Sequence, residues 1–508
     1  MNRRALVMTL INIVLSIAMS GSALAQAGNA VNGETIYSKH CIGCHGEEGD
    51  GLGPAAERLN PPPRDFTAGT YKIKTTGFDD MVPNDSDIIR MISDGMPGTA
   101  MPGWSDMLSE QDILDVVAYI KTFAGYEEEQ PTDQLDYGTQ IEASPESIAS
   151  GKELFLDGDR CSECHGEQGK GNGIKRLKDD NGDRTWPRNL TKPWTFRGSN
   201  DPRDIFTRIS IGIPGTQMPA FSDPASKKKL SIEERWHVAN FVVSLAKTIE
   251  VVRAENTVIK ADKSSVNLPA TPDDPAWQQT EPSTFFLVPQ IIAEQRFFTP
   301  SSDTITVRAL YNDEDIALLL EWDDRTMSIP GDEKAEKIAD PGISEDAVAV
   351  QLPVTIPDGV EKPYFGMGDA SHPVNIWQWL SGTTQKSETT KLINSRGFKD
   401  IQIRDASIIG LQTSGKYEHG TWRVVMKRPL NGAEEEIDIE FIEGRFIPIS
   451  FAAWDGSNSE EGSKHTMTTW YWLLLKPAAS SKPLVITLFV VLLIIIGQIW
   501  WLRSTRAR

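Results

Sequence analysis

The sequence contains only four cysteines among its 508 residues, and all four lie in two short motifs, Cys41-x-x-Cys44-His45 and Cys161-x-x-Cys164-His165. No cysteine is left over for a disulfide framework. Basic residues are also scarce, since 51 Lys and Arg stand against 71 Asp and Glu and leave a net charge of −20. A nucleic acid partner requires a basic surface, so this balance argues against one.

The overall composition is that of a folded protein, with 39% hydrophobic and 24% charged residues. It excludes disorder of the whole chain, and the length predicts about three domains. Long apolar runs occur near the two ends. Arg3 and Arg4 precede an apolar run from Ala5 to Ala18, and Ala23-Leu24-Ala25 has the small-x-small pattern of a signal-peptidase site. We therefore expect a signal peptide over residues 1–25.

The second apolar run, Leu484 to Leu502, holds 19 residues without a charge. This length predicts a single transmembrane helix over 484–502, and a buried core helix is less favoured because no amphipathic face can be drawn on the run. Arginines crowd its far side, so the positive-inside rule places the tail, 503–508, in the cytoplasm. The expected location is the cytoplasmic membrane, with the bulk of the chain in the periplasm.

Between these ends the chain repeats itself once. Cys161 follows Cys41 by 120 residues, and the segment 212–221 repeats 95–104 at a distance of 117 residues. Each copy closes with a capping-box pattern followed by helical spacing, over 109–123 and 231–245. The sequence predicts two all-α domains, 26–126 and 147–250, joined by a polar linker over 127–146.

The Cys-x-x-Cys-His motif predicts covalent attachment of a c-type haem, with two thiols bound to the porphyrin and the adjacent histidine bound to iron. Zinc would need further Cys or His ligands at fixed spacing, which the sequence does not supply. The two motifs use every cysteine and are each flanked by the same pattern of helices. This repetition favours a haem site over a zinc site. Motif and helices together resemble class I cytochrome c over about 32–125 and 147–248.

In the resembling family, the sixth iron ligand is a methionine in a loop before the last helix. The first copy offers Met96 and Met101, but the second has Ile213 opposite Met96 and Met218 opposite Met101. The repeat thus selects Met101 and Met218, with simple loop residues as the alternative. A thioether on low-spin haem raises the reduction potential and closes the iron to substrates, which suits electron transfer.

Other polar residues favour structural roles. His40 and His237 have no matching histidine in the other copy, so packing is expected for both. Arg64 does match Arg188. Such an arginine pairs well with a haem propionate through a charge-assisted bond, and a solvated arginine is the open alternative.

Beyond residue 250 the pattern changes from helical to extended. Residues 305–311 alternate, 312–315 are turn-like and 316–322 form a second apolar strand, which predicts a hairpin. Four more strands are expected over 347–352, 374–379, 422–426 and 447–453. This pattern predicts a mostly β sandwich domain over 251–478.

Several segments of this domain resemble the haem-b γ subunit of ethylbenzene dehydrogenase and its relatives. These are periplasmic molybdopterin oxidoreductases that include chlorate reductase, dimethylsulfide dehydrogenase and some nitrite oxidoreductases. The resemblance covers about 251–476 and rests on Asp274-Pro275-Ala276-Trp277, 307–312, Trp322-Asp323-Asp324, Met367-Gly368, 373–379, 454–458, Lys464 and Trp470-Tyr471.

In that family one b-type haem is held between a methionine and a lysine, and the resemblance carries these roles to Met367 and Lys464. A thioether suits haem iron, and burial lowers the pKa of a lysine so that it can lose its proton and bind metal. The alternative is that Met367 packs the core and Lys464 is an exposed lysine. His465 is a rival ligand that strand alternation would point to the opposite face.

The sequence therefore predicts a membrane-tethered electron carrier with two haem c and one haem b, and no catalytic residue of its own. Its expected partners are a molybdopterin catalytic subunit, an iron–sulfur subunit and a basic soluble cytochrome or terminal oxidase, towards which the negative charge would steer it. Two alternatives remain. One is a stand-alone dihaem peroxidase or dehydrogenase with an open iron, and the other is a dihaem carrier whose β domain is a non-haem binding module.

Overall fold

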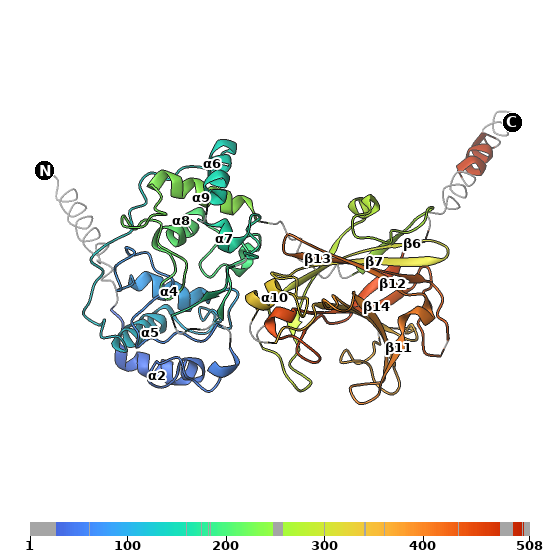
Figure 1. Cartoon of the computed structure of the whole chain (residues 1–508), viewed down its shortest axis with the longest axis horizontal. Coiled ribbons are helices and arrows are strands. Elements are labelled where there is room, and N and C mark those ends of the chain that lie inside the picture. The colour runs from blue at the N-terminus through green and yellow to red at the C-terminus, as the bar shows by residue number, and fades with distance from the viewer. Residues whose placement is uncertain are drawn as a thin grey trace, which may run out of the picture. The chain divides into compact units, whose positions relative to one another are not determined.

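The structure is a computed structural model with two compact units, 1–163 with 177–247 and 164–176 with 248–508 (Figure 1). The predicted signal peptide and the predicted cytoplasmic tail, 503–508, lie outside the described residues. The structure describes residues 27–246, 258–477, 491–499 and 501, except positions 60, 159, 174, 181, 183, 299, 340, 341, 360 and 435.

The prediction of a transmembrane helix over 484–502 is wrong. Among the described residues, no helix is long and apolar enough to cross a membrane. The helical residues that the structure describes in this run are 491–499 and 501. Residues 484–490, 500 and 502 of the predicted span lie outside the described part of the chain.

The first unit is mainly helical and contains the two copies of the repeat, except for residues 164–176 of the second copy, which belong to the second unit. Ser109 and Asp112 form a capping box at the start of α5, and Ser231 with Glu234 does the same at α9, which confirms both predicted helices. The second copy also holds a short ribbon that the repeat did not predict. The elements are α2 (Ala30–His40), α3 (Ile42–His45), α4 (Asp85–Asp94), α5 (Glu110–Thr122), α6 (Pro145–Leu156), α7 (Ser162–His165), β1 (Leu177–Lys178), β2 (Arg184–Thr185), α8 (Pro202–Ile211) and α9 (Ile232–Ser244).

In each copy the first and last helices cross in close contact at a glycine. A Cβ added to Gly33 on α2 would overlap the carbonyl oxygen of Asp115 on α5. The second copy repeats this, because a Cβ on Gly151 of α6 would overlap the carbonyl oxygen of His237 on α9. Aromatic rings pack beside each crossing, for example those of Tyr37 and Phe123 at 5.3 Å.

The segment expected to be a polar linker is bound along its length. The Asp80 carboxylate accepts hydrogen bonds from the backbone N–H groups of Thr132 (2.7 Å) and Asp133 (2.9 Å) in the first copy. The Trp236 indole of the second copy donates to the carbonyl oxygen of Tyr137 at 2.9 Å. The linker is therefore part of the folded unit.

The second unit is built mainly from one long, mostly antiparallel sheet. Its principal strand order is β11-β10-β9-β8-β14-β16-β3-β6-β7-β13-β12, with parallel pairing at β16–β3 and β3–β6. The elements are β3 (Val258–Lys263), β4 (Ser283–Phe286), β5 (Val288–Pro289), β6 (Thr304–Tyr311), β7 (Asp315–Asp323), α10 (Glu333–Ile338), β8 (Ala347–Pro353), β9 (Val374–Leu380), β10 (Thr389–Ser395), β11 (Ile401–Asp405), β12 (Gln412–Glu418), β13 (Thr421–Pro429), β14 (Phe446–Trp454), β15 (Thr466–Met467) and β16 (Tyr471–Leu475).

The predicted hairpin is confirmed as β6 and β7, which pair antiparallel. Asn312 closes the turn, because its side-chain oxygen accepts from the backbone N–H groups of Glu314 (2.9 Å) and Asp315 (2.7 Å). A short polar side chain that bonds the backbone two and three residues later is a common way to stabilise a turn.

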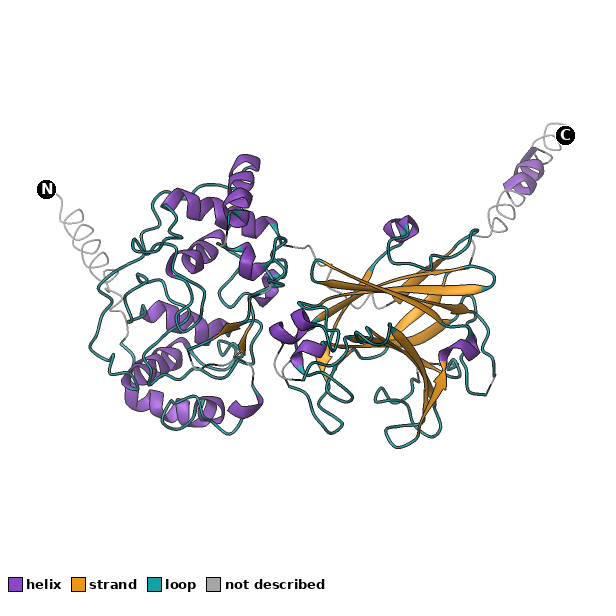
Figure 2. Cartoon of the chain, viewed as in Figure 1, coloured by secondary structure: helices purple, strands orange, loops and turns teal. Residues whose placement is uncertain are grey.

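The long sheet folds over on itself into two layers (Figure 2). The ring of Trp379 on β9 lies 4.9 Å from that of Trp422 on β13, although these strands are far apart in the strand order. The hydroxyls of Thr390 on β10 and Thr413 on β12 are 2.5 Å apart, so the two ends of the sheet meet. The space between the layers is filled by the hydrophobic core of the unit.

Replacing Gly33 or Gly151 by alanine is expected to lower the free energy of unfolding by about 2 kcal/mol, because the added Cβ must push two helix backbones apart. The better helix propensity of alanine, about 1 kcal/mol, offsets only part of the loss. Denaturant unfolding followed by circular dichroism measures the difference. Gly359→Ala is the control, since nothing lies within 4 Å of its added Cβ; equal stabilities of all three variants would contradict the close crossing.

Candidate functional site

The first Cys-x-x-Cys-His motif occupies a single helical turn. The backbone N–H groups of Cys44 and His45 both bond to the carbonyl oxygen of Cys41, at 3.2 and 2.9 Å, so three functional side chains leave one turn. Cys41 and Cys44 are not joined in a disulfide. Burial and the neighbouring Cys44 raise the pKa of the Cys41 thiol to about 11. The second motif forms the matching turn, α7.

A glycine loop after each motif was missed by the sequence reasoning. Gly51 and Gly171 bond through their N–H groups to the carbonyl oxygens of His45 (2.9 Å) and His165 (2.8 Å). Both glycines have φ near +77°, a region that other residues rarely adopt. The identical spacing of glycines at 46, 49, 51 and 53 and at 166, 169, 171 and 173 was the available signal.

His45 is oriented by its backbone partner. Its Nδ1 lies 3.0 Å from the carbonyl oxygen of Arg64 and its ring stacks on Phe66 at 4.6 Å. A carbonyl can only accept, so Nδ1 carries the proton and Nε2 keeps its lone pair for a metal. Burial also lowers the pKa of His45, which favours the neutral ring that metal binding needs.

The two methionine loops have the same hydrogen bonds. The N–H of Met101 donates to the Thr99 hydroxyl and that of Met218 to the Thr216 hydroxyl, both at 3.2 Å. The carbonyl oxygen of Met101 accepts from Met96 N–H at 3.1 Å. The repeat thus builds one loop twice, with Met101 and Met218 in equivalent places.

In the second copy, the predicted methionine ligand lies near one of the predicted haem-binding cysteines. Met218 packs against the hydrophobic cluster that contains Cys161. In the first copy, Trp104 packs with Cys41 in the corresponding cluster, whereas Met101 is half-buried beside it in sequence. His40 packs on Trp104, with ring centroids 5.2 Å apart, so its role is structural. The His237 ring bonds the Ser147 hydroxyl at 2.9 Å and is structural too.

Arg64, Lys72 and Arg197 lie near one another, with Asp179 and Asp180 as acidic neighbours of Lys72, and Arg188 lies beside the first methionine loop. We call the four basic residues, Arg64, Lys72, Arg188 and Arg197, the cationic cluster. Burial, together with the neighbouring Arg64 and Arg197, lowers the pKa of Lys72 to about 8. Burial, with Arg64 as second cause, also lowers the pKa of Arg197. The Nε atom of Arg197 is buried and has no hydrogen-bond partner among the described residues. Such a donor points to an anionic group, because an unpaired buried charge is costly.

Each methionine loop approaches cations of the other domain. The glycine of the first loop, Gly98, lies against the Arg188 guanidinium, with 3.1 Å between an added Cβ and the nearest nitrogen. In the second loop, a Cβ added to Gly215 would lie 3.7 Å from the Cε atom of Lys72. Arg90 clamps the domains together, since it bonds both carboxylate oxygens of Asp204 at 2.9 Å.

In the β unit, Met367 has an unusual backbone. Its φ is +68°, a conformation that costs a non-glycine residue about 1–2 kcal/mol. Its carbonyl oxygen accepts from Gly397 N–H at 2.9 Å, and its side chain packs against a cluster that includes Trp454 and Trp470. Strain of this kind collects at functional positions.

Lys464 lies in the stretch after β14 and is half-buried. Its neighbour His465 packs on Trp454 at 4.7 Å and bonds the Gly462 carbonyl through Nδ1 at 3.1 Å. Burial lowers the pKa of His465 to about 4. Because Trp454 also belongs to the cluster of Met367, Met367 and His465 border one apolar region, and Lys464 is next to His465 in the chain. The ligand roles of Met367 and Lys464 stay predictions, and His465 stays a rival.

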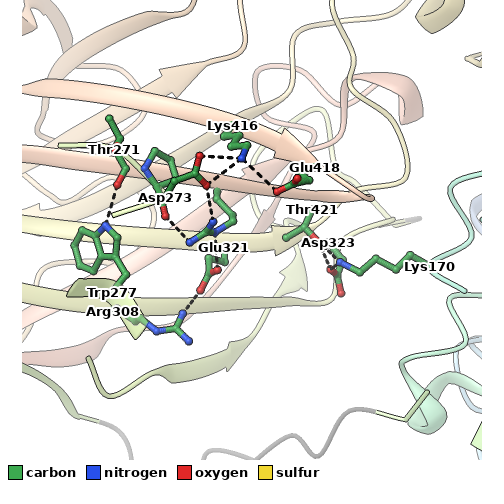
Figure 3. A network of polar contacts seen from close by, with 12 residues as sticks. Lys170, Thr271, Asp273, Trp277, Arg308, Glu321, Asp323, Lys416, Glu418 and Thr421 are labelled. Carbon is green, nitrogen blue, oxygen red and sulfur yellow. Dashed lines mark hydrogen bonds and ion pairs between the residues drawn. The ribbon is translucent and has the colours of Figure 1, made fainter. Parts of the chain in front are cut away.

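The residues that follow Cys164 contact the β strands of their own unit. Lys170 donates to the Thr421 hydroxyl and pairs with Asp323 at 3.4 Å, while Thr421 donates to Asp323 at 3.0 Å (Figure 3). Asp323 ends β7 and Thr421 begins β13. The segment that carries His165 is therefore held by a polar contact to this edge of the sheet.

Comparison with protein families gives two matches. The cytochrome c family matches residues 30–124 and again 148–246. The ethylbenzene dehydrogenase family matches residues 274–393. Cytochrome c55X of Stutzerimonas stutzeri is 40% identical over 99 residues, which cover 19% of this chain and 71% of that protein.

Two relatives match longer stretches. A putative respiratory nitrate reductase heme subunit, ORF7, of Haloferax mediterranei is 27% identical over 183 residues, which cover 36% of this chain and 60% of the relative. The chlorate reductase subunit gamma of Ideonella dechloratans is 27% identical over 180 residues, which cover 35% of this chain and 66% of the relative. The chain thus spans less than two thirds of the length of either.

Lys170→Met is expected to speed amide hydrogen exchange in residues 164–176 and at the start of β13, because the ion pair and hydrogen bond that hold them are lost. Hydrogen exchange with mass spectrometry measures this peptide by peptide. Lys178→Met is the control, since that side chain is exposed. If both variants exchange like the unaltered protein, the Lys170 contact does not hold the segment.

Proposed function

This chain belongs to the cytochrome c family, and we propose that it carries electrons between haem groups as a subunit of a periplasmic molybdopterin oxidoreductase. Two c-type haems would lie in the helical domains and one b-type haem in the ethylbenzene dehydrogenase domain. The observation that carries the proposal is the cationic cluster between two domains that each present one Cys-x-x-Cys-His turn and one methionine loop.

The cationic cluster fits haem by charge. A haem presents two carboxylates, and the buried, unpartnered Nε of Arg197 together with the half-buried Arg64, Lys72 and Arg188 offers donors for such groups. When bound, haem iron supplies one-electron oxidation and reduction. Residues from both domains line the cluster, which favours two cofactors near one shared surface over two independent carriers.

The residues around each iron position favour a closed coordination. His45 holds its proton on Nδ1 and offers Nε2, and the equivalent turn places His165 in the second copy. Met101 and Met218 occupy identical loops and would supply the opposite ligand. Two closed sites suit electron transfer and disfavour the alternative of a stand-alone dihaem peroxidase or dehydrogenase.

For the β domain, Met367 and Lys464 would hold the b-type haem. The strained backbone of Met367 and the apolar cluster it shares with Trp454 support this assignment. Lys170 would keep the segment of His165 against the sheet that carries Asp323. A non-haem binding module remains the second candidate for this domain.

The partners follow from the relatives, which are named as a nitrate reductase heme subunit and a chlorate reductase gamma subunit. We propose a molybdopterin catalytic subunit and an iron–sulfur subunit as the electron donor or acceptor on one side. On the other side, the net charge of −20 would steer a basic cytochrome or terminal oxidase. The export pattern at residues 1–25 supports a periplasmic location.

Met101→Leu and Met218→Leu are each expected to open one c-type iron, because leucine fills the space of methionine without a donor atom. The visible spectrum of the purified chain should then show one high-spin c haem, and the potential of that haem should fall. Met96→Leu is the matched control and should leave every haem low-spin. Unchanged spectra of both Met101 and Met218 variants would contradict the assignment.

Lys464→Ala is expected to abolish the b-type haem spectrum and to leave two c-type haems per chain. His465→Ala is the matched control from the next position and should retain the b-type haem. The reverse outcome would make His465 the ligand. A chain that holds two haems before any substitution would leave the β domain as a binding module without haem.

A further inference from the structure

Three aspartates from distant parts of the β unit meet in its interior. Asp324 follows β7, Asp346 precedes β8 and Asp455 follows β14. None of the three is more than 3% exposed. One carboxylate oxygen from each lies within 4.8 Å of the other two.

The negative charge of this group is poorly balanced. The carboxylate of Glu460, also fully buried, accepts the N–H of Asp455 at 3.2 Å and so adds a fourth acid. Arg325 is the neighbouring cation. Burial lowers the pKa of its guanidinium, and Asp455 and Asp324 are the nearby charges that most oppose this effect. One guanidinium against four carboxylates leaves an excess of three negative charges if all are ionised.

Several of these carboxylate oxygens accept hydrogen bonds from N–H or O–H donors. Asp346 accepts from Ser328 N–H (2.6 Å), Gly456 N–H (2.8 Å) and the Trp422 indole (2.8 Å). Asp455 accepts from both the N–H and the hydroxyl of Ser457. In contrast, Oδ2 of Asp324 is buried and accepts no hydrogen bond from any described residue.

We propose that Asp324, Asp346 and Asp455 bind one calcium ion. Ca²⁺ takes oxygen ligands at about 2.3–2.6 Å, so two ligands of one ion lie at most about 5 Å apart, as these oxygens do. A cation at this place would bind the Asp324 carboxylate, whose Oδ2 has no hydrogen-bond partner among the described residues, and with all four acids ionised it would neutralise two of the three excess charges. The absence of sulfur and nitrogen donors among the three side chains favours a hard cation over zinc or copper.

The ion would tie the end of β7 to two strands that are not its neighbours in the sheet. Asp346 and Asp455 flank the paired strands β8 and β14, whereas four strands separate β7 from β8 in the strand order. Asp455 begins the stretch that leads to Lys464, so a bound cation would hold the start of that stretch to the end of β7. This role is structural and is independent of the proposed electron transfer.

Metal analysis of the full, haem-loaded chain tests the proposal. The chain is expected to retain about one Ca²⁺ after desalting, to lose it on dialysis against EGTA, and to melt several degrees lower in its absence. Added Ca²⁺ should restore the melting temperature, whereas Mg²⁺ at the same concentration should not. A chain with no bound Ca²⁺, whose melting is the same with Ca²⁺ and with EGTA, overturns the proposal.

Asp324→Asn assigns the ion to this cluster. The variant keeps the size of the side chain but removes its charge, and it should bind no Ca²⁺ and show no Ca²⁺-dependent melting. Asp400→Asn, an exposed carboxylate of the same unit, is the matched control and should behave like the unaltered chain. If Asp324→Asn still binds one Ca²⁺, the site is elsewhere and the proposal fails. Should this variant not fold, Asp346→Asn and the chelation experiment on the unaltered chain decide the matter.

Discussion

The close crossing of first and last helices at Gly33 and Gly151 fixes the geometry on which both helical domains depend. The chain runs from α2 straight into Cys41, whose N–H bonds to the carbonyl of Tyr37 at 2.8 Å. The methionine loop leads into α5 in the same way, a few residues before its capping serine. The helix crossing thus holds together, in each copy, the helix that leads into the Cys-x-x-Cys-His turn and the helix that follows the methionine loop.

Much of this arrangement could be predicted from short sequence patterns. Capping boxes at Ser109 and Ser231 mark the last helices, and the Asn312 turn marks the hairpin, because each depends on residues within a few positions of each other. The repeat selects Met101 and Met218 by simple alignment. Glycine spacing after the two histidines could have predicted the matching loops as well, since left-handed backbone at such positions requires glycine.

The parts that escaped prediction depend on contacts between distant residues. The cationic cluster brings together Lys72 and Arg197, and the acidic group brings together Asp324 and Asp455. No spacing of residues along the chain predicts either cluster. The expectation of a transmembrane helix over 484–502 failed as well, since no helix among the described residues is long and apolar enough to cross a membrane. A polar composition likewise hid the firm binding of the segment around Thr132 and Tyr137.

The bound segment between the two helical domains makes them one folded body rather than two domains on a flexible linker. Two domains joined by a flexible linker see each other at an effective concentration set by the length of the linker, often in the millimolar range, and they dock only reversibly. Here Asp80 holds one end of the segment, Trp236 holds the other, and Arg90 closes the gap through Asp204. The entropy lost when the two domains dock is therefore lost once, when the chain folds. We expect the two domains to unfold together in a single cooperative transition rather than separately.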